Sequence, residues 1–143
     1  MIYAATVFGE VLGKPRPRVT RHGAYTPRKF SDYEERIAAE FRKQLPKPLE
    51  GAVSLKVTVQ RELPKSRPKK TVSEPDTFRP DLDNIVKLVM DALNGVAYLD
   101  DNQVTSVRAE KLPRVRLETD EFVRIEVETL ICRARPFCRA QKG

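Results

Sequence analysis

The clearest pattern in the chain is an apolar stripe between residues 82 and 93. Apolar residues recur there at spacings of three and four, which places them on one side of a helix. They are Leu82, Ile85, Val86, Val89, Met90 and Leu93. Asp81 or a near neighbour can cap the start, and Asn94-Gly95 can end the helix because both residues tolerate a left-handed backbone. The pattern predicts a helix over residues 82–93.

A second helix is predicted in the first third of the chain. Ser31 is a suitable N-cap residue, and Pro46 marks the latest point at which the helix can end. The apolar residues between them also follow helical spacing. They are Tyr33, Ile37, Ala38, Phe41 and Leu45.

Strands are predicted where β-branched residues dominate or alternate with polar ones. Residues 2–11 form a first strand, and residues 19–25 are interpreted as its return strand in a hairpin. Alternation is strong in residues 53–59 and 123–131 and weaker in 103–112. We expect the 53–59 strand to pair with the first strand. The order β-β-α-β-α-β-β predicts an α+β fold, with two main helices on a small mixed or mainly antiparallel sheet.

Two basic segments interrupt this pattern. Residues 13–18 read GKPRPR, which fits neither a helix nor a central strand. Residues 62–79 are rich in proline and basic residues and poor in large apolar ones, so we expect a mobile basic loop. Both segments are predicted to contact DNA, through Lys14, Arg16, Arg18, Lys69, Lys70 and Arg79.

The length of 143 residues suits a single domain, which we place at residues 1–131, followed by a basic C-terminal tail at 132–143. No stretch approaches the roughly 20 apolar residues of a membrane span, and the N-terminus does not resemble a signal peptide. Cys132 and Cys138 match neither a disulfide framework nor a usual zinc spacing, so we interpret them as reduced and incidental.

Charge is distributed unevenly along the chain. The net charge is +7, yet residues 81–101 hold five aspartates and a single lysine. A basic surface attracts a polyanion, whereas an acidic island within it repels the same polyanion unless a cation is bound there. The distribution therefore suggests a metal site in a nucleic-acid enzyme. The alternative is a solvated acidic helix face on a basic protein.

Several charged residues can share one region of the 82–93 helix. Asp83, Lys87 and Asp91 follow one another at i, i+4 and i+8, and Asp81 lies just before them. Asp101 follows the helix after a short apolar segment that could fold back beside the helix start. Three or four carboxylates are therefore expected to converge.

Such a carboxylate group suits magnesium, which prefers oxygen ligands and retains several waters. In phosphodiester hydrolysis the metal can activate water and neutralise the scissile phosphate, and Lys87 could offset further charge on that phosphate. The alternative role for Lys87 is an ordinary salt bridge with Asp83 or Asp91. A calcium loop is excluded because Ile85 and Val86 occupy positions where that motif needs an oxygen ligand and glycine.

Three segments of this region resemble the RusA family of Holliday junction resolvases. They read RPDLDNIVK at 79–87, DALNGV at 91–96 and LDDNQV at 99–104. The GKPRPR segment and YTP at 25–27 are also similar to family sequence. Some members carry a base directly before the first aspartate, where this chain has Pro80, so Arg79 would supply any equivalent contact.

The resemblance implies a homodimer that makes paired nicks in opposing strands of four-way DNA junctions. It implies that Asp81, Asp83 and Asp101 are metal-binding catalytic residues and that Lys87 is the catalytic lysine. The remaining aspartates, Asp91 and Asp100, are assigned supporting roles. Magnesium is the expected cofactor, with manganese as a substitute, and neither a membrane nor a nucleotide cofactor is expected. The implied location is the cytoplasm, in a bacterial or phage context.

Two other functions stay open at this point. The first is a non-catalytic protein that binds branched DNA, with the acidic island as a solvated face or a degenerate site. The second is a magnesium phosphotransferase or glycosyltransferase that uses the D-x-D pair, although the sequence lacks a recognisable nucleotide-binding loop.

Overall fold

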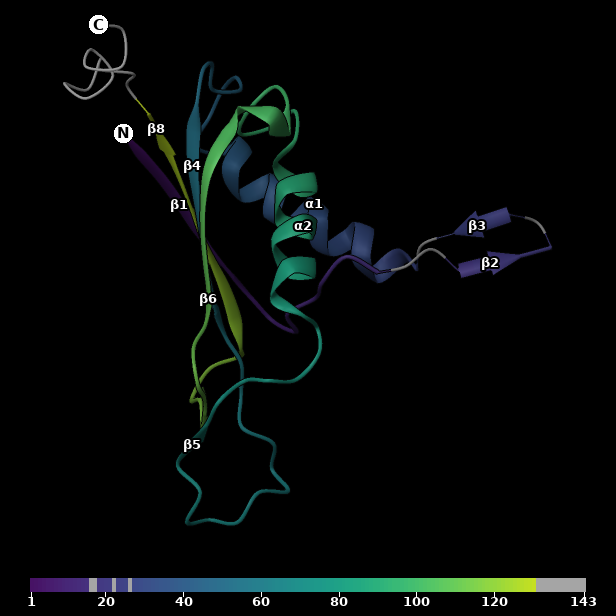
Figure 1. The fold of residues 1–143 in the computed structure, drawn as a ribbon, viewed down its shortest axis with the longest axis vertical. Coiled ribbons are helices and arrows are strands. Elements are labelled where there is room, and N and C mark those ends of the chain that lie inside the picture. The colour runs from purple at the N-terminus through teal and green to yellow at the C-terminus, as the bar shows by residue number, and fades with distance from the viewer. Residues whose placement is uncertain (16–17, 22, 26, 131–143) are drawn as a thin grey trace, which may run out of the picture.

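The fold is a four-stranded sheet with two helices packed on one of its faces (Figure 1). This computed structural model describes residues 1–15, 18–21, 23–25 and 27–130. The α+β class and the mixed sheet predicted from the sequence are confirmed. Arg16, Cys132, Cys138 and the 132–143 tail lie outside the described residues. No helix of the described ranges is long and apolar enough to cross a membrane.

The sheet has the strand order β1-β8-β4-β6. Antiparallel pairs join β1 (Ile2–Phe8) to β8 (Phe122–Thr129) and β8 to β4 (Val53–Gln60), whereas β4 runs parallel to β6 (Val104–Lys111). The expected pairing of residues 53–59 with the first strand is wrong, because β8 lies between the two. An alternating pattern decides which face of a strand is buried, but not which strand lies beside it.

Two pairs of short strands lie outside the main sheet. β2 (Arg18–Thr20) pairs with β3 (Gly23–Tyr25), and β5 (Ser73–Glu74) pairs with β7 (Arg114–Val115). The prediction that residues 19–25 return along the first strand is therefore wrong. Most of these residues instead form the two short strands of a small hairpin, and Gly23, the first residue of β3, has a φ of +111°.

The helices are α1 (Arg28–Arg42) and α2 (Leu82–Leu93). α1 begins earlier than predicted, with Pro27 at the N-cap position, and the Ser31 hydroxyl donates to the Arg28 carbonyl inside the helix. Pro27 has the extended backbone of an N-cap residue, with a ψ of 142°, so Arg28 takes the first helical position. α2 begins and ends as predicted, and Gly95 follows it with a φ of +78°.

The core lies between the helices and one face of the sheet. Every second residue of β4 and β8 is buried, as the alternation predicts. On α2 the fully covered residues are Ile85, Leu88, Val89, Ala92 and Leu93. Leu82, Val86 and Met90 are only partly buried at the margin, so the buried stripe is rotated slightly from the predicted one.

A strap at Gly13 and Lys14 joins the two helices. The Lys14 amide donates to the Asn84 carbonyl at 2.8 Å, and its ammonium contacts Glu34 of α1 at 3.1 Å and Asp91 of α2 at 2.8 Å. Gly13 is buried so close to α2 that there is no space for a side chain. The strap therefore fixes the first turn of α2 against α1.

The basic segment at 62–79 has defined contacts at its base. Arg67 and Arg114 contact the Glu74 carboxylate, and both guanidinium groups lie over the Phe78 ring. Lys69 and Lys70 are exposed at the far part of the segment. The mobility expected from the sequence stays a prediction for this far part.

We predict that Gly13→Ala destabilises the fold. A Cβ at this position would lie 2.9 Å from the Pro80 Cβ and 3.1 Å from the Asn84 Cβ, both of which are close to rigid backbone. Overpacking of this kind typically costs about 1–3 kcal/mol. Urea unfolding should show a lower midpoint, and an unchanged midpoint would contradict the tight approach.

We predict that Lys14→Met lowers the free energy of unfolding at neutral pH by about 0.5 kcal/mol. The effect is small because the side chains of Lys14 and Asp91 are each about a third exposed, so that solvent screens their ion pair. The pKa of Lys14 is raised, chiefly by its hydrogen bond with Asp91. A lysine with a raised pKa stabilises the fold below its unfolded pKa of about 10.4 and loses this effect as the pH rises through the folded value. Urea unfolding of both proteins should therefore differ at pH 7 and converge at strongly alkaline pH.

Candidate metal and nucleic-acid site

Two carboxylates lie free at the start of α2. Asp81 occupies the N-cap position in extended backbone, yet its side chain makes no capping hydrogen bond. Asp81 and Asp83 are both exposed. Within the ranges that the structure covers, neither side chain takes part in a hydrogen bond or an ion pair. Their oxygens are therefore available to an external cation.

Lys87 lies one helical turn beyond Asp83 and is also exposed. It makes no ion pair with any described residue, so the salt bridge to Asp83 or Asp91, which was the alternative role for Lys87, is absent among them. Asp91 instead binds Lys14, which agrees with a supporting role for this aspartate. Lys14, predicted to contact DNA, is already held by two carboxylates, and its contact with DNA stays a prediction.

Asp100 and Asp101 lie at the other end of α2, where the 3-10 turn η1 (Asp101–Gln103) begins. The buried Tyr98 donates its hydroxyl to the Met90 carbonyl at 2.8 Å, which ties the returning chain to the last turns of the helix. The side chain of Gln103 accepts from the Leu99 and Asp100 amides and holds the turn. A hydrogen bond with the Asp100 carboxyl raises the pKa of Asp101.

The predicted convergence of carboxylates does not occur within one chain. Among the described residues no three carboxylate, imidazole or thiol groups lie close enough to share a metal. Asp83 and Asp91 are eight residues apart, or about 12 Å along a helix. The tight return through Tyr98 keeps Asp101 near Asp91, so the segment after α2 does not fold back to the helix start.

The two carboxylates at the start of α2 suit a magnesium ion. This cation takes hard oxygen ligands and is commonly bound through one or two carboxylates, with water and substrate phosphate completing its shell. Asp81 and Asp83 supply such a pair without competition from other described side chains. The donor set at this end fits the cation, whereas Asp101 belongs to the opposite end of the helix.

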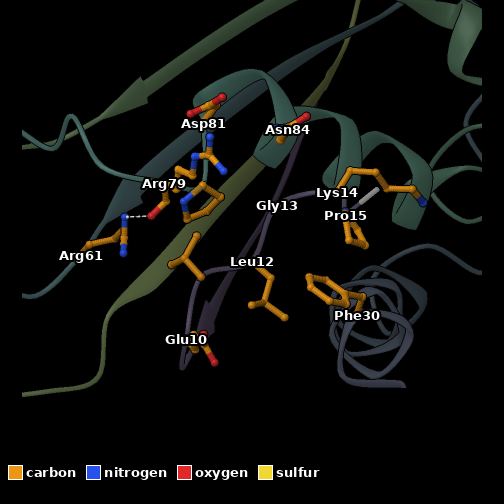
Figure 2. Close-up of a pocket in the computed structure, with 12 residues that line it drawn as sticks. Glu10, Leu12, Gly13, Lys14, Pro15, Phe30, Arg61, Arg79, Asp81 and Asn84 are labelled. Atoms are coloured by element: carbon orange, nitrogen blue, oxygen red, sulfur yellow. Dashed lines mark hydrogen bonds between the residues drawn. The ribbon is translucent and has the colours of Figure 1, made fainter. Parts of the chain in front are cut away.

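A hollow of about 620 Å³ adjoins Asp81 (Figure 2). Leu12 and Phe30 form an apolar wall, and Arg61 and Arg79 bring positive charge to the side where α2 begins. Arg79 is exposed and its guanidinium has no partner among the described residues. The hollow can therefore accept an anionic, partly apolar group such as a nucleotide.

The other predicted DNA contacts are less well placed. Lys69 and Lys70 are exposed on the basic segment, and the loop between β4 and β5 extends away from α2 in Figure 1. The backbone of Arg18 lies in β2, but its side chain and all of Arg16 lie outside the description. The DNA-contact role of these residues stays a prediction.

The sequence patterns did not indicate which side chains hold the segment before Asp81 and the turn at Asp101. Arg61 bonds the Arg79 carbonyl and Lys111 bonds the Phe78 carbonyl, while Gln103 organises the turn at Asp101. Arg61 and Lys111 bind carbonyls 18 and 33 residues away, which no local spacing signals. Gln103 and Asp100 form a capping box, so their spacing of three residues could have indicated this contact.

Two comparisons show which known proteins this chain is similar to. Residues 9–129 match a family described as Endodeoxyribonuclease RusA. The chain is also 36% identical over 131 residues to the protein named Uncharacterized protein YqaN of Bacillus subtilis (strain 168), an alignment that covers 78% of this chain and 91% of that relative. The matched range includes Asp81, Asp83 and Asp101, together with the strap at Gly13 and Lys14. The chain belongs to the RusA family of endodeoxyribonucleases.

Proposed function

We propose that this protein is a magnesium-dependent, structure-selective endonuclease that resolves four-way DNA junctions through paired nicks in opposing strands. The observation that carries this proposal is the carboxylate pair of Asp81 and Asp83, which have no partner among the described residues. Asp81 also lines a hollow that has two arginines. Carboxylates on a basic protein have no role in attracting DNA, so their exposure beside the arginines favours cation binding. Membership of a nuclease family supports the same reading.

Each charged residue has a distinct role in this proposal. Asp81 and Asp83 hold the cation, which when bound orients and acidifies a water and neutralises the scissile phosphate; manganese substitutes for magnesium. Lys87, with no ion pair to any described residue, offsets the charge that develops on the phosphate. Arg79 contacts the DNA backbone beside the hollow, and Lys69 and Lys70 contact it farther along.

The proposal includes a homodimer, because paired nicks in opposing strands require two sites related by a two-fold axis. A second copy also offers a role for Asp101. Within one chain this aspartate is separated from Asp81 and Asp83 by most of the length of α2. We therefore assign Asp101 to the metal site of the second copy as part of this proposal.

The alternative function is a non-catalytic protein that binds branched DNA. One observation favours it: no three potential metal ligands cluster within the described part of a single chain. Such a protein would bind four-way junctions through its basic residues and would need no metal. Metal dependence of cleavage separates the two functions.

We predict that the protein nicks an end-labelled mobile four-way junction with magnesium and not with EDTA, and leaves a linear duplex of the same sequence intact. Asp81→Asn and Asp83→Asn should each lower the single-turnover rate at least about a hundredfold, as expected when a group that stabilises the transition state is lost. Asp120→Asn is the matched control, because Asp120 is an exposed aspartate in a loop distant from α2 in sequence.

Both asparagine variants should remain folded, because the exposed carboxylates contribute only their interaction with the helix dipole, about 1 kcal/mol or less. Thermal unfolding checks this point. Tight junction binding without cleavage in magnesium or manganese would contradict the proposed nuclease activity and support the non-catalytic DNA-binding function. Equal cleavage by the wild type and both variants would show that these aspartates do not hold the metal.

A further inference from the structure

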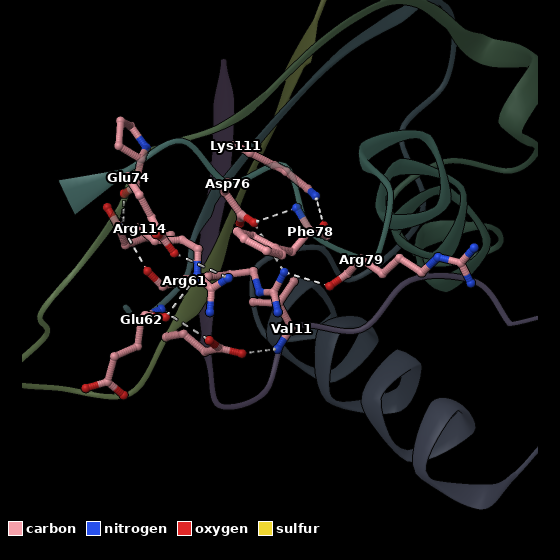
Figure 3. A network of polar contacts seen from close by, with 12 residues as sticks. Val11, Arg61, Glu62, Glu74, Asp76, Phe78, Arg79, Lys111 and Arg114 are labelled. Carbon is pink, nitrogen blue, oxygen red and sulfur yellow. Dashed lines mark hydrogen bonds and ion pairs between the residues drawn. The ribbon is translucent and has the colours of Figure 1, made fainter. Parts of the chain in front are cut away.

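The chain that leads into Asp81 is held from the sheet side by two basic side chains (Figure 3). Arg61, just after β4, donates from Nη1 to the Arg79 carbonyl at 2.8 Å. Lys111, the last residue of β6, donates from Nζ to the Phe78 carbonyl at 2.7 Å. Side chains at the ends of two neighbouring strands therefore bind the carbonyls of Phe78 and Arg79, the two residues that precede Pro80 and Asp81.

Arg61 is itself fixed by a buried acid. The Asp76 side chain is completely covered, and its Oδ1 lies 3.4 Å from Arg61 Nη1. The same oxygen accepts from the Phe78 amide at 3.4 Å. A buried carboxylate without a partner is strongly unfavourable, so Asp76 keeps the guanidinium in place. One arginine thus connects a buried carboxylate to the Arg79 carbonyl.

The ring of Phe78 adds a third attachment. The Arg114 guanidinium lies 4.6 Å from the ring centroid, and its Nε donates to the Glu62 carbonyl at 3.2 Å. The segment from Asp76 to Arg79 is therefore held by Arg61, which follows β4, by Lys111 of β6 and by Arg114 of β7.

Asp81 has a particular need for such a support. Its carboxylate contacts no described side chain, so its position depends on the backbone before it and on α2 after it. Magnesium tolerates little deviation from octahedral geometry, and groups that orient metal ligands typically change affinity about 10–100-fold. We infer that Arg61, fixed by Asp76 and assisted by Lys111, is a positioning residue that places Asp81 for metal binding; this inference rests on the proposed function.

The test compares Arg61→Ala and Lys111→Met with the wild-type full-length protein. Free Mn²⁺ is counted by electron paramagnetic resonance in titrations without DNA, and single-turnover junction cleavage is measured across a range of Mg²⁺ concentrations. Each variant should bind Mn²⁺ about tenfold more weakly and need about tenfold more Mg²⁺ for half-maximal cleavage. Excess Mg²⁺ should restore most of the rate.

Arg36→Ala is the matched control, because the Arg36 guanidinium of α1 also donates to a main-chain carbonyl, that of Phe8 at the end of β1, which does not lead into Asp81. This variant should keep the wild-type Mn²⁺ affinity. Metal-free junction binding by Lys111→Met should stay within about twofold of wild type, since this side chain is not assigned to a phosphate. Lys111→Met keeps the test decisive if Arg61→Ala fails to fold.

Other outcomes overturn the inference in distinguishable ways. Unchanged Mn²⁺ affinity, with a rate that falls only in proportion to the folded fraction, would reduce Arg61 and Lys111 to loop anchors. Weaker metal-free junction binding with a smaller salt dependence would make Arg61 a phosphate contact. If the wild type cleaves junctions and both variants have the same Mn²⁺ affinity and Mg²⁺ dependence as the wild type, only this inference is contradicted. A wild type that neither binds Mn²⁺ nor cuts would remove the proposed function as well.

Discussion

The burial of one side of α2 against the sheet decides where every charged group of the site lies. Ile85, Leu88, Val89 and Leu93 are fully covered, and each such side chain contributes about 1.5–3 kcal/mol. Rotation of the helix would expose this surface, so its orientation is strongly fixed. Asp81 and Asp83 consequently lie at one end of α2, and Asp101 lies beyond the other.

Ion pairs distinguish the acidic residues that stabilise the fold from those whose carboxylate oxygens have no described partner. Asp91 and Glu34 share the ammonium of Lys14, which joins α1 to α2, and Asp76 is buried against Arg61. Asp81 and Asp83 keep no partner among the described residues. Asp81 and Asp83 thus keep exposed oxygens at the start of α2, where the proposed function assigns the cation.

Much of the fold could be predicted from local pattern. The spacing of apolar residues gave α2 to its terminal residues, and alternation identified β4 and β8 together with their buried faces. Strand neighbours could not be predicted, since β8 enters the sheet between β1 and β4 although it comes last in sequence. The start of α1 was missed because Pro27 precedes the helix where Ser31 had seemed the better cap.

For the site, the sequence by itself determined which residues could do the chemistry: the aspartates before and after one amphipathic helix, and a lysine one turn into it. The oxygen chemistry of carboxylates and the helical period need no distant contacts. The tertiary structure decided that Asp101 remains apart from Asp81, that Asp91 is paired with Lys14, and that Arg61 and Lys111 hold the chain before Asp81. Those outcomes depend on strand order and on side chains that reach main-chain carbonyls far away in sequence, which no local pattern encodes.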